Sequence, residues 1–162
     1  MGLSKLGIFH TAIGVIAIIA AVIAFIRSGK IDLSKPAGKI YFYFTLIASL
    51  TALGLSSVKG LNPGHILAVL IVILILVAYF LYAKKQGNNR VRYVETLFLS
   101  FSFFLSMIPT VNETLNRIPA GHPLAHGPKD PLIVKTLLLL LILFVVGSVL
   151  QFRQQWKINK LP

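Results

Sequence analysis

ILAVLIVILILVAYFLYA, at residues 66–83, decides the fold of this chain. The run contains no charged side chain, and about 20 consecutive apolar residues in a helix are enough to cross the hydrocarbon core of a bilayer. The whole chain of 162 residues is 56% hydrophobic and only 12% charged, whereas a soluble domain carries about 25% charged residues. A chain of this length cannot bury so much apolar surface in water, so lipid must be the solvent for most of it.

Four further stretches are apolar and long enough to cross a membrane. They are separated by charged or Gly/Pro-rich segments, namely RSGKIDLSKPAGK, KGLNPG, KKQGNNRVR and RIPAGHPLAHGPKDP. We therefore predict a single transmembrane domain over residues 1–162, an all-α bundle of about five helices. Pro109 predicts a kink in the fourth helix, which could continue to about Asn116. The five predicted spans are Leu6–Ile26, Ile40–Val58, His65–Ala83, Tyr93–Val111 and Leu132–Phe152.

The basic residues predict how the chain is oriented in the membrane. Of the sixteen, eleven lie on one side, in the first and third loops and the C-terminal tail, four lie on the other side, and Lys135 lies inside the fifth span. Because cytoplasmic loops carry the excess of Lys and Arg, we expect a multi-pass cell-membrane protein with an outer N-terminus and a cytoplasmic C-terminus. The eleven are Arg27, Lys30, Lys35, Lys39, Lys84, Lys85, Arg90, Arg92, Arg153, Lys157 and Lys160; the four are Lys5, Lys59, Arg117 and Lys129.

The formal net charge of +12 does not indicate a nucleic-acid partner. The basic residues form short clusters beside apolar runs, as expected of groups that set topology and contact anionic lipid. Cysteine is absent, which excludes disulfides, thiolate metal sites and a cysteine nucleophile. The motifs HExxH and GxSxG and phosphate-cradling glycine loops are also absent, so no enzyme class is indicated. Membrane lipid is the expected partner, and other membrane subunits or further copies of the chain remain open.

Two of the predicted spans carry faces of small or hydroxylated residues. In the first span, His10 shares one face with Gly14, Ala17, Ala21 and Ala24, because these positions repeat with the helical period. Small residues let another helix approach closely, so this face is expected to pack inside the bundle with His10 directed inward. In the second span a hydroxyl face predicts bonds to neighbouring helices, because hydroxyls in lipid need partners. Its members are Thr45, Ser49 and Ser56.

The fourth span carries a polar stripe of Glu95, Ser102, Ser106 and Glu113. At 3.6 residues per turn the four positions fall within roughly 20° of one line, with the two carboxyl groups about 27 Å apart along the helix. Ionisable groups inside spans are costly and usually face the interior or a cavity, which predicts a proton or ion path. The structural alternative is that both glutamates lie in the headgroup zones and the serines bond to their own helix.

All four histidines are expected on the outer side of the membrane, together with Glu113. His10 opens the first span and His65 the third, whereas His122 and His126 lie in the last outer loop. Imidazole and carboxylate suit a transition metal such as zinc, copper or iron, and two facing histidines could hold a haem. We therefore predict His10 and His65 as cofactor ligands, with Glu113, His122 and His126 as further metal ligands. The alternative is a structural His10 with solvated loop histidines.

Four segments of the chain resemble the DUF2306 family of predicted bacterial membrane proteins, which has no established function: FHTAIGVIAIIAAVIAFIRSGK, KPAGKIYFYFTLIASLTAL, NPGHILAVLIVILILVAYFLYAKK and NNRVRYVETLFLSFSFFLSMIP. The resemblance covers roughly residues 7 to 120 and implies a membrane-helix fold. In that family the first and third spans open near a histidine, matched here by His10 and His65. The family also tends to have a histidine before the second and fourth spans. This chain has Lys35-Pro36 and Arg90 to Tyr93 there, so no cytoplasmic-side histidine site carries over.

Three classes of function follow from these patterns. The first is a membrane protein that binds a metal or haem at its outer face and has a redox or accessory role. The second is a small-solute or proton-coupled carrier that uses the polar stripe of the fourth span. The third is a structural subunit of a larger membrane complex. An absorption spectrum and a metal analysis separate the first class from the other two.

Overall fold

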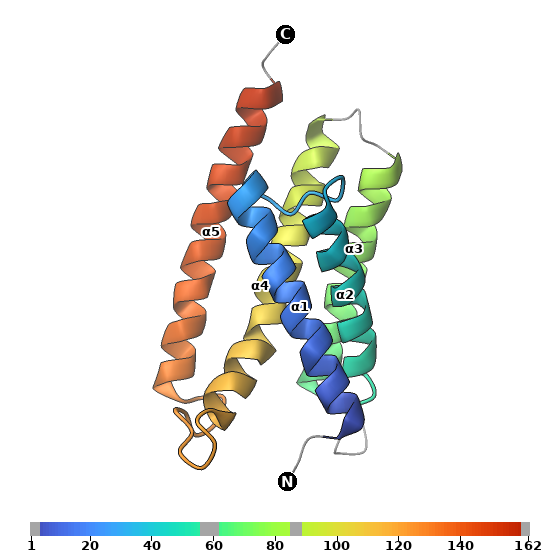
Figure 1. Cartoon of the computed structure of the whole chain (residues 1–162). Coiled ribbons are helices and arrows are strands. Elements are labelled where there is room, and N and C mark those ends of the chain that lie inside the picture. Colours follow the sequence, from blue (N-terminus) through green and yellow to red (C-terminus); the bar gives the residue numbers. More distant parts are fainter. Residues whose placement is uncertain (1–3, 56–61, 85–88, 160–162) are drawn as a thin grey trace. The chain divides into compact units, whose positions relative to one another are not determined.

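The computed structural model describes residues 4–55, 62–84 and 89–159, and this part of the chain is all-α, as predicted. By their contacts the residues form two compact units, Met1–Ser102 and Phe103–Pro162. The helices follow one another along the chain (Figure 1). They are α1 (Lys5–Ser28), α2 (Pro36–Ala52), α3 (Pro63–Lys84), α4 (Asn89–Arg117) and α5 (Pro131–Asn159).

Four of the described helices, α1, α3, α4 and α5, have the length and composition of membrane spans. The chain is therefore a polytopic membrane protein. The remaining helix, α2, has 17 residues, which is the lower end of the length that crosses a bilayer, about 17–25 residues. Within the first unit α2 brings the chain back alongside α1 before α3 begins (Figure 1). A fifth crossing by α2 stays a prediction.

Prolines fix where three of these helices begin. Pro36, Pro63 and Pro131 are the first residues of α2, α3 and α5. Proline suits this position because its fixed φ matches the helix and because the first helical N–H has no intrahelical partner to lose. At the start of α1, the Ser4 side chain accepts the N–H of Gly7 at 3.0 Å. The starts of these helices thus follow from local sequence.

The helix that corresponds to the second predicted span, Ile40–Val58, begins earlier, at Pro36, and ends earlier, at Ala52. After Ala52 the N–H groups of Leu53, Gly54 and Leu55 donate to carbonyls three residues earlier, at 3.1–3.3 Å. These bonds tighten the last turn and end the α-helix, although the apolar run continues. Ser56 lies outside the described residues. The fourth helix continues through Pro109 to Arg117, close to the predicted end at Asn116.

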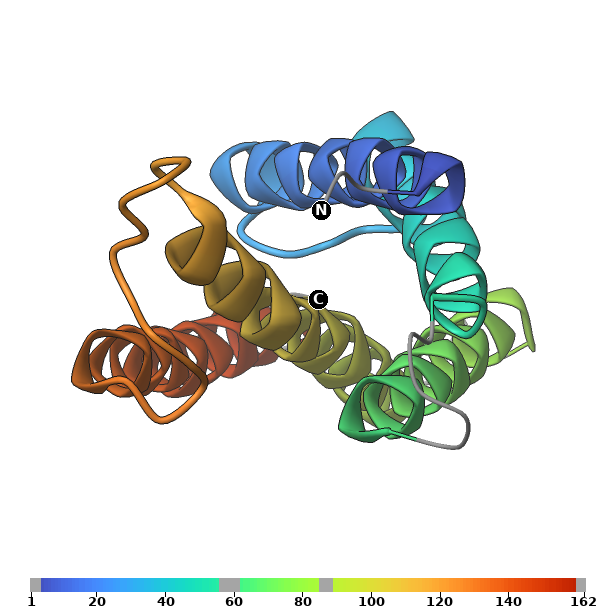
Figure 2. The ribbon, with the colours of Figure 1, turned by 90° about the horizontal axis from the view of Figure 1, so that it is seen from below.

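The small face of α1 packs within the first unit. Ala17, Ala21 and Ala24 are at most 4% exposed, and α1 packs chiefly against α2, which lies between α1 and α3 (Figure 2). The predicted packing face is confirmed for these three alanines. Gly14 differs, because a Cβ added there would meet no atom within 4 Å outside its own helix. Close approach therefore depends on the alanines and not on Gly14.

The second unit consists of the end of α4, the following loop and α5. Its core joins Val111, Ala125 and Ile133. The loop is held to α4 because the Ala125 N–H donates to the Leu115 carbonyl at 3.0 Å and the Gly127 N–H donates to the Asn116 Oδ1 at 2.6 Å. Most large apolar side chains of α5 are exposed. Such a surface suits contact with lipid, which is as apolar as the side chains themselves.

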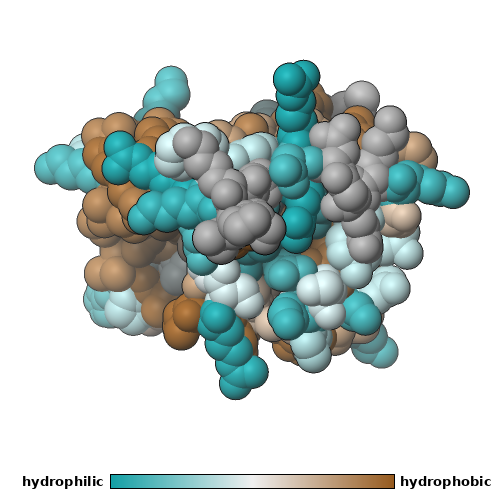
Figure 3. Space-filling view, turned by 90° about the horizontal axis from the view of Figure 1, so that it is seen from above, coloured by the Kyte–Doolittle hydropathy of each residue, from teal (hydrophilic) through white to brown (hydrophobic). Residues whose placement is uncertain are grey.

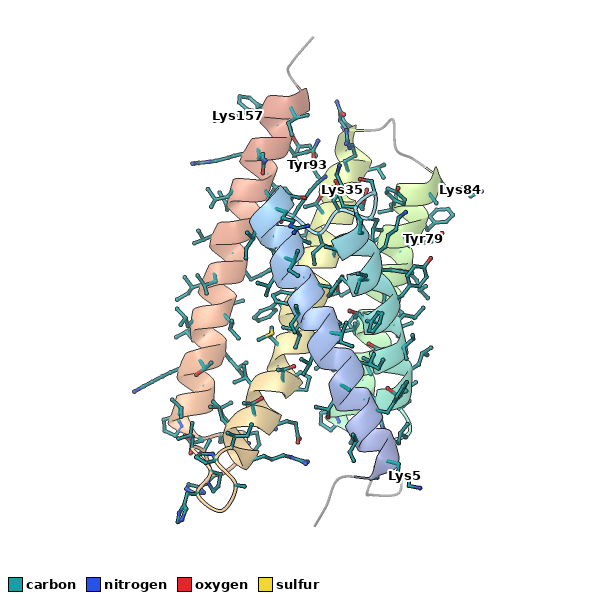
Figure 4. All side chains as sticks on the ribbon, in the orientation of Figure 1. Lys5, Lys35, Tyr79, Lys84, Tyr93 and Lys157 are labelled. Carbon is teal, nitrogen blue, oxygen red and sulfur yellow. The ribbon has the colours of Figure 1, made fainter. Side chains whose placement is uncertain are left out.

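Charged and aromatic residues lie near the ends of the helices. In the first unit Lys5 lies at one end, and Lys35 and Lys84 lie at the other (Figure 4). Near the Lys84 end, the Tyr79 ring is 43% exposed and stacks on Phe42 with the ring centroids 5.0 Å apart. Seen from above, hydrophilic side chains project from the surface and apolar side chains are also exposed (Figure 3). This distribution is typical of a protein with an apolar membrane band.

Candidate functional site

The interior of the first unit contains a polar face of α2. Tyr41, Thr45 and Ser49 follow one another at intervals of four residues, so they share one side of the helix. All three are buried, with at most 5% of each residue exposed. The sequence predicted Thr45 and Ser49 on this face but missed Tyr41, which carries a third hydroxyl at the same helical spacing.

Tyr41 joins this face to the predicted stripe of α4. The Tyr41 hydroxyl lies 2.7 Å from the Ser102 Oγ, and Ser102 is fully buried. The Ser102 hydroxyl donates to the Leu99 carbonyl of its own helix at 2.8 Å. Since that bond uses the Ser102 proton, Tyr41 is the donor in the bond between the two hydroxyls. Ser102 thus combines a bond to its own helix, as the structural alternative predicted, with an interhelical bond to Tyr41, and the proton or ion path stays a prediction.

The segment between α1 and α2 is folded around Asp32. Ile31 and Leu33, on either side of it, are at most 3% exposed. The N–H and the hydroxyl of Ser34 donate to the Asp32 Oδ1 at 2.9 and 2.7 Å. Burial raises the pKa of the Asp32 carboxyl, but the bonds from Ser34 and two nearby lysines outweigh burial, so the pKa lies below its usual value. Asp32 is therefore a carboxylate fixed at this end of the unit.

Glu95 lies close to this segment. Its half-buried carboxyl group is within electrostatic range of Lys30, Asp32 and Arg92. The segment is held against α2 at Gly38, where an added Cβ would lie 2.0 Å from the Asp32 carbonyl oxygen. Only glycine fits such a close approach of two backbones. One end of the unit interior thus has an ionisable glutamate beside a rigid, charged turn.

The stripe predicted for α4 divides between two environments. Glu95 and Ser102 belong to the first unit, where they lie half-buried and buried. Glu113 belongs to the second unit and forms an ion pair with Arg117 on its own helix, with both side chains 55% exposed. Ser106 also falls in the second unit and is half-buried. An exposed pair separated by four residues stabilises a helix only slightly.

His10 connects α1 to the last turn of α2. Its Nδ1 lies 3.0 Å from the Ala48 carbonyl oxygen and 3.2 Å from the Thr51 Oγ1. A carbonyl only accepts, so Nδ1 carries the proton and the Nε2 of the neutral ring is an acceptor. An imidazole at this position also interacts favourably with the negative end of the α2 dipole. His10 is therefore directed inward, as its helical face predicted.

His65 caps the start of α3. The Asn62 Oδ1 accepts the N–H of His65 at 3.0 Å, and the His65 Nδ1 accepts the N–H of Asn62 at 3.3 Å. This reciprocal pair is a capping box in which histidine replaces the usual glutamate or glutamine. Because Nδ1 accepts, the proton of the neutral ring is on Nε2, which is buried and has no hydrogen-bond partner in the described part of the chain. In this tautomer Nε2 carries the proton, so metal binding there would require Nδ1 to give up its bond to the Asn62 N–H.

The loop histidines lie apart from these two side chains in sequence and belong to the second unit. His122 and His126 are exposed, and the N–H of His126 donates to the Asp130 Oδ2 at 3.0 Å. Asp130 immediately precedes α5. Bonds from the N–H groups of Leu132 and His126 lower the pKa of its carboxyl. Over residues 4–55, 62–84 and 89–159, no group of three or more His, Cys, Asp or Glu side chains could hold a metal ion.

We call a set of six polar residues of the first unit the polar file, of which Tyr41 and Ser102 are joined by a hydrogen bond between α2 and α4. Its members are Glu95, Ser102, Tyr41, Thr45, Ser49 and His10. It has an ionisable group at each end and hydroxyls between them. Hydroxyls both donate and accept, so such a file can relay protons or hold small polar guests.

No family model, curated protein or solved structure matches the chain. The resemblance to the DUF2306 family therefore stays a prediction, and the function has to be inferred from the side chains themselves.

Proposed function

We propose that the first unit moves protons across the membrane along the polar file, alone or coupled to a small solute. The observation that carries the proposal is the buried line of hydroxyls at Tyr41, Thr45 and Ser49, joined through Tyr41 to Ser102 of another helix. Hydroxyl side chains also join helices in structural bundles, and what favours transport here is that two ionisable residues of the same unit, Glu95 and His10, accompany the buried hydroxyls. Polar groups inside a membrane are costly and are usually functional.

Each member of the file has a defined role in this proposal. Glu95 takes up or releases the proton at the end near Asp32, where it lies within electrostatic range of Lys30 and Arg92. The hydroxyls of Ser102, Tyr41, Thr45 and Ser49 pass the proton by exchanging donor and acceptor roles. His10 serves the opposite end, since its Nε2 can accept a proton while Nδ1 stays bonded to the Ala48 carbonyl.

The basic asymmetry supports an orientation with the Glu95 end in the cytoplasm. Lys30, Lys35 and Arg92 lie at this end, whereas Lys5 lies at the His10 end. Lysine and arginine accumulate on cytoplasmic loops, so we propose an outer N-terminus and a cytoplasmic C-terminus. The proton would then pass between an outer histidine and a cytoplasmic glutamate.

Metal or haem binding at the outer face is a second candidate, favoured by one contact. The His10 Nδ1 donates to a backbone carbonyl, which is how metal-binding histidines are commonly oriented. His65 has the opposite arrangement, with its ligand nitrogen protonated, so a site shared by both rings would require the α3 cap to open. Elemental analysis and an absorption spectrum of the purified protein test this candidate. Bound zinc, copper or iron would support it, and protein without metal or a Soret band would remove it.

Proton movement is tested by a matched pair of carboxyl variants, Glu95→Gln and Glu113→Gln. Both glutamates lie on the stripe of α4, but only Glu95 belongs to the polar file. In proteoliposomes with an internal pH-sensitive dye, we expect Glu95→Gln to slow proton flux by about ten-fold or more, because a positioned proton-transfer group is lost. Glu113→Gln should conduct like the wild type. Equal rates for the wild type and Glu95→Gln would exclude the proposed role of Glu95.

A further inference from the structure

The hydroxyl of Thr45 differs from other threonine hydroxyls of the described helices. Thr11, Thr51, Thr110 and Thr136 each donate to a carbonyl three or four residues earlier in their own helix, at 2.7–3.0 Å. This is the usual way for threonine to satisfy its hydroxyl within a helix. Thr45 is 4% exposed, yet its Oγ1 has no hydrogen-bond partner among the described residues. A buried hydroxyl is costly to leave unsatisfied, so the absence of a partner for Thr45 among the described residues requires an explanation.

The neighbours of Thr45 along α2 make a polar environment. Tyr41 lies one turn before it and Ser49 one turn after it, on the same buried face, so the three positions span about 12 Å of helix. Each carries a neutral hydroxyl, and no carboxylate belongs to this stretch of the file. Divalent cations prefer carboxylate ligands. Neutral hydroxyls that can donate and accept suit a water molecule, which in proteins typically makes about three hydrogen bonds to buried polar groups.

We infer that the Thr45 hydroxyl binds a water molecule, and that the proton passes through this water. The inference rests on the proposed function of the same file and names its central binding position. Because the Thr45 Oγ1 makes no hydrogen bond to the described residues, its proton and its lone pairs are available to bond to the water molecule.

The test uses the variants Thr45→Val and Thr45→Ser, with Thr11→Val as the control because the Thr11 hydroxyl already bonds to its own helix. Valine keeps the shape of threonine and removes the hydroxyl, whereas serine keeps the hydroxyl. We expect Thr45→Val to slow proton flux into proteoliposomes by about ten-fold or more, with Thr45→Ser and Thr11→Val close to the wild type. Thr45→Val that conducts like the wild type would overturn the inference. Flux that depends on Na⁺ at constant pH would also overturn it, since a cation would then be the guest.

Thermal stability in detergent gives a second readout that does not depend on transport. If Thr45 holds a water, its removal by valine breaks bonds, and Tm should fall relative to Thr45→Ser. If the hydroxyl is unoccupied, valine removes an unsatisfied buried group, and Tm should rise, which contradicts the inference. Wild-type protein without proton flux would refute the proposed function and the passage of the proton through the water, and the Tm comparison would still decide whether Thr45 binds a water. If Thr45→Val fails to fold, Thr45→Ala is compared with Thr45→Ser in the same two assays.

Discussion

Replacing Gly38 by alanine is expected to destabilise the protein more than any other single methyl group added to a glycine of the described chain. The new Cβ would lie 2.0 Å from the Asp32 carbonyl oxygen, and both groups belong to backbone that cannot turn away as a side chain can. Overpacking typically costs about 1–3 kcal/mol and occasionally more. We expect the upper end of this range, which corresponds to a decrease in Tm of about 6–12 °C for a chain of this size.

The matched control is Gly14→Ala in α1. A Cβ at Gly14 would meet no atom within 4 Å outside its own helix, and alanine favours a helix over glycine by up to about 1 kcal/mol. Its Tm should equal or exceed that of the wild type. The measurement is the fraction of monodisperse protein in detergent after heating. If Gly38→Ala has the same Tm as Gly14→Ala, the segment around Asp32 does not lie against α2 as described.

In intact cells, a single introduced cysteine is expected to react with an impermeant thiol reagent only if it lies on the outer side of the membrane. The chain contains no cysteine, so each introduced thiol reports one position. His122 and Gln154 are exposed in the second unit, before and after the apolar part of α5. The excess of basic residues predicts that His122→Cys faces outward and that Gln154→Cys faces the cytoplasm. A membrane-impermeant thiol reagent should therefore label only His122→Cys.

The control for this experiment is the same reagent on permeabilised cells, where both thiols should react. External labelling of Gln154→Cys together with protection of His122→Cys would invert the orientation. Labelling of both from outside would mean that the apolar part of α5 does not cross the membrane. The predicted orientation also contains an internal check, since it requires α2 to cross although it has only 17 residues.

The positions of the helices could be predicted from the sequence because local features determine them. Apolar runs exclude water, and Pro36, Pro63 and Pro131 fix three helix starts. The end of α2 could not be predicted in this way. Its apolar run continues past Ala52, and only the tighter bonds from Leu53 to Leu55 end the helix there.

The candidate site was predictable only in part, because periodicity gives the face of a side chain and not its partner. The stripe of α4 contained Ser102, but its bond to Tyr41 depends on how α2 lies beside α4. Tyr41 was missed because a tyrosine within an apolar run is usually a packing residue or an interface anchor. His65 was predicted as a ligand from its place at the start of a span. The spacing of Asn62 and His65 matches that of a capping box, a signal that the sequence already contained.

The most direct test of proton movement along the polar file is the flux through the wild-type protein itself. Purified protein is reconstituted into liposomes with an internal pH-sensitive dye, a pH difference is imposed, and a potassium ionophore removes any opposing voltage. We expect the pH difference to decay about ten-fold or more faster than in protein-free liposomes, and faster than in liposomes that contain Glu95→Gln. Decay at the rate of protein-free liposomes would contradict the account.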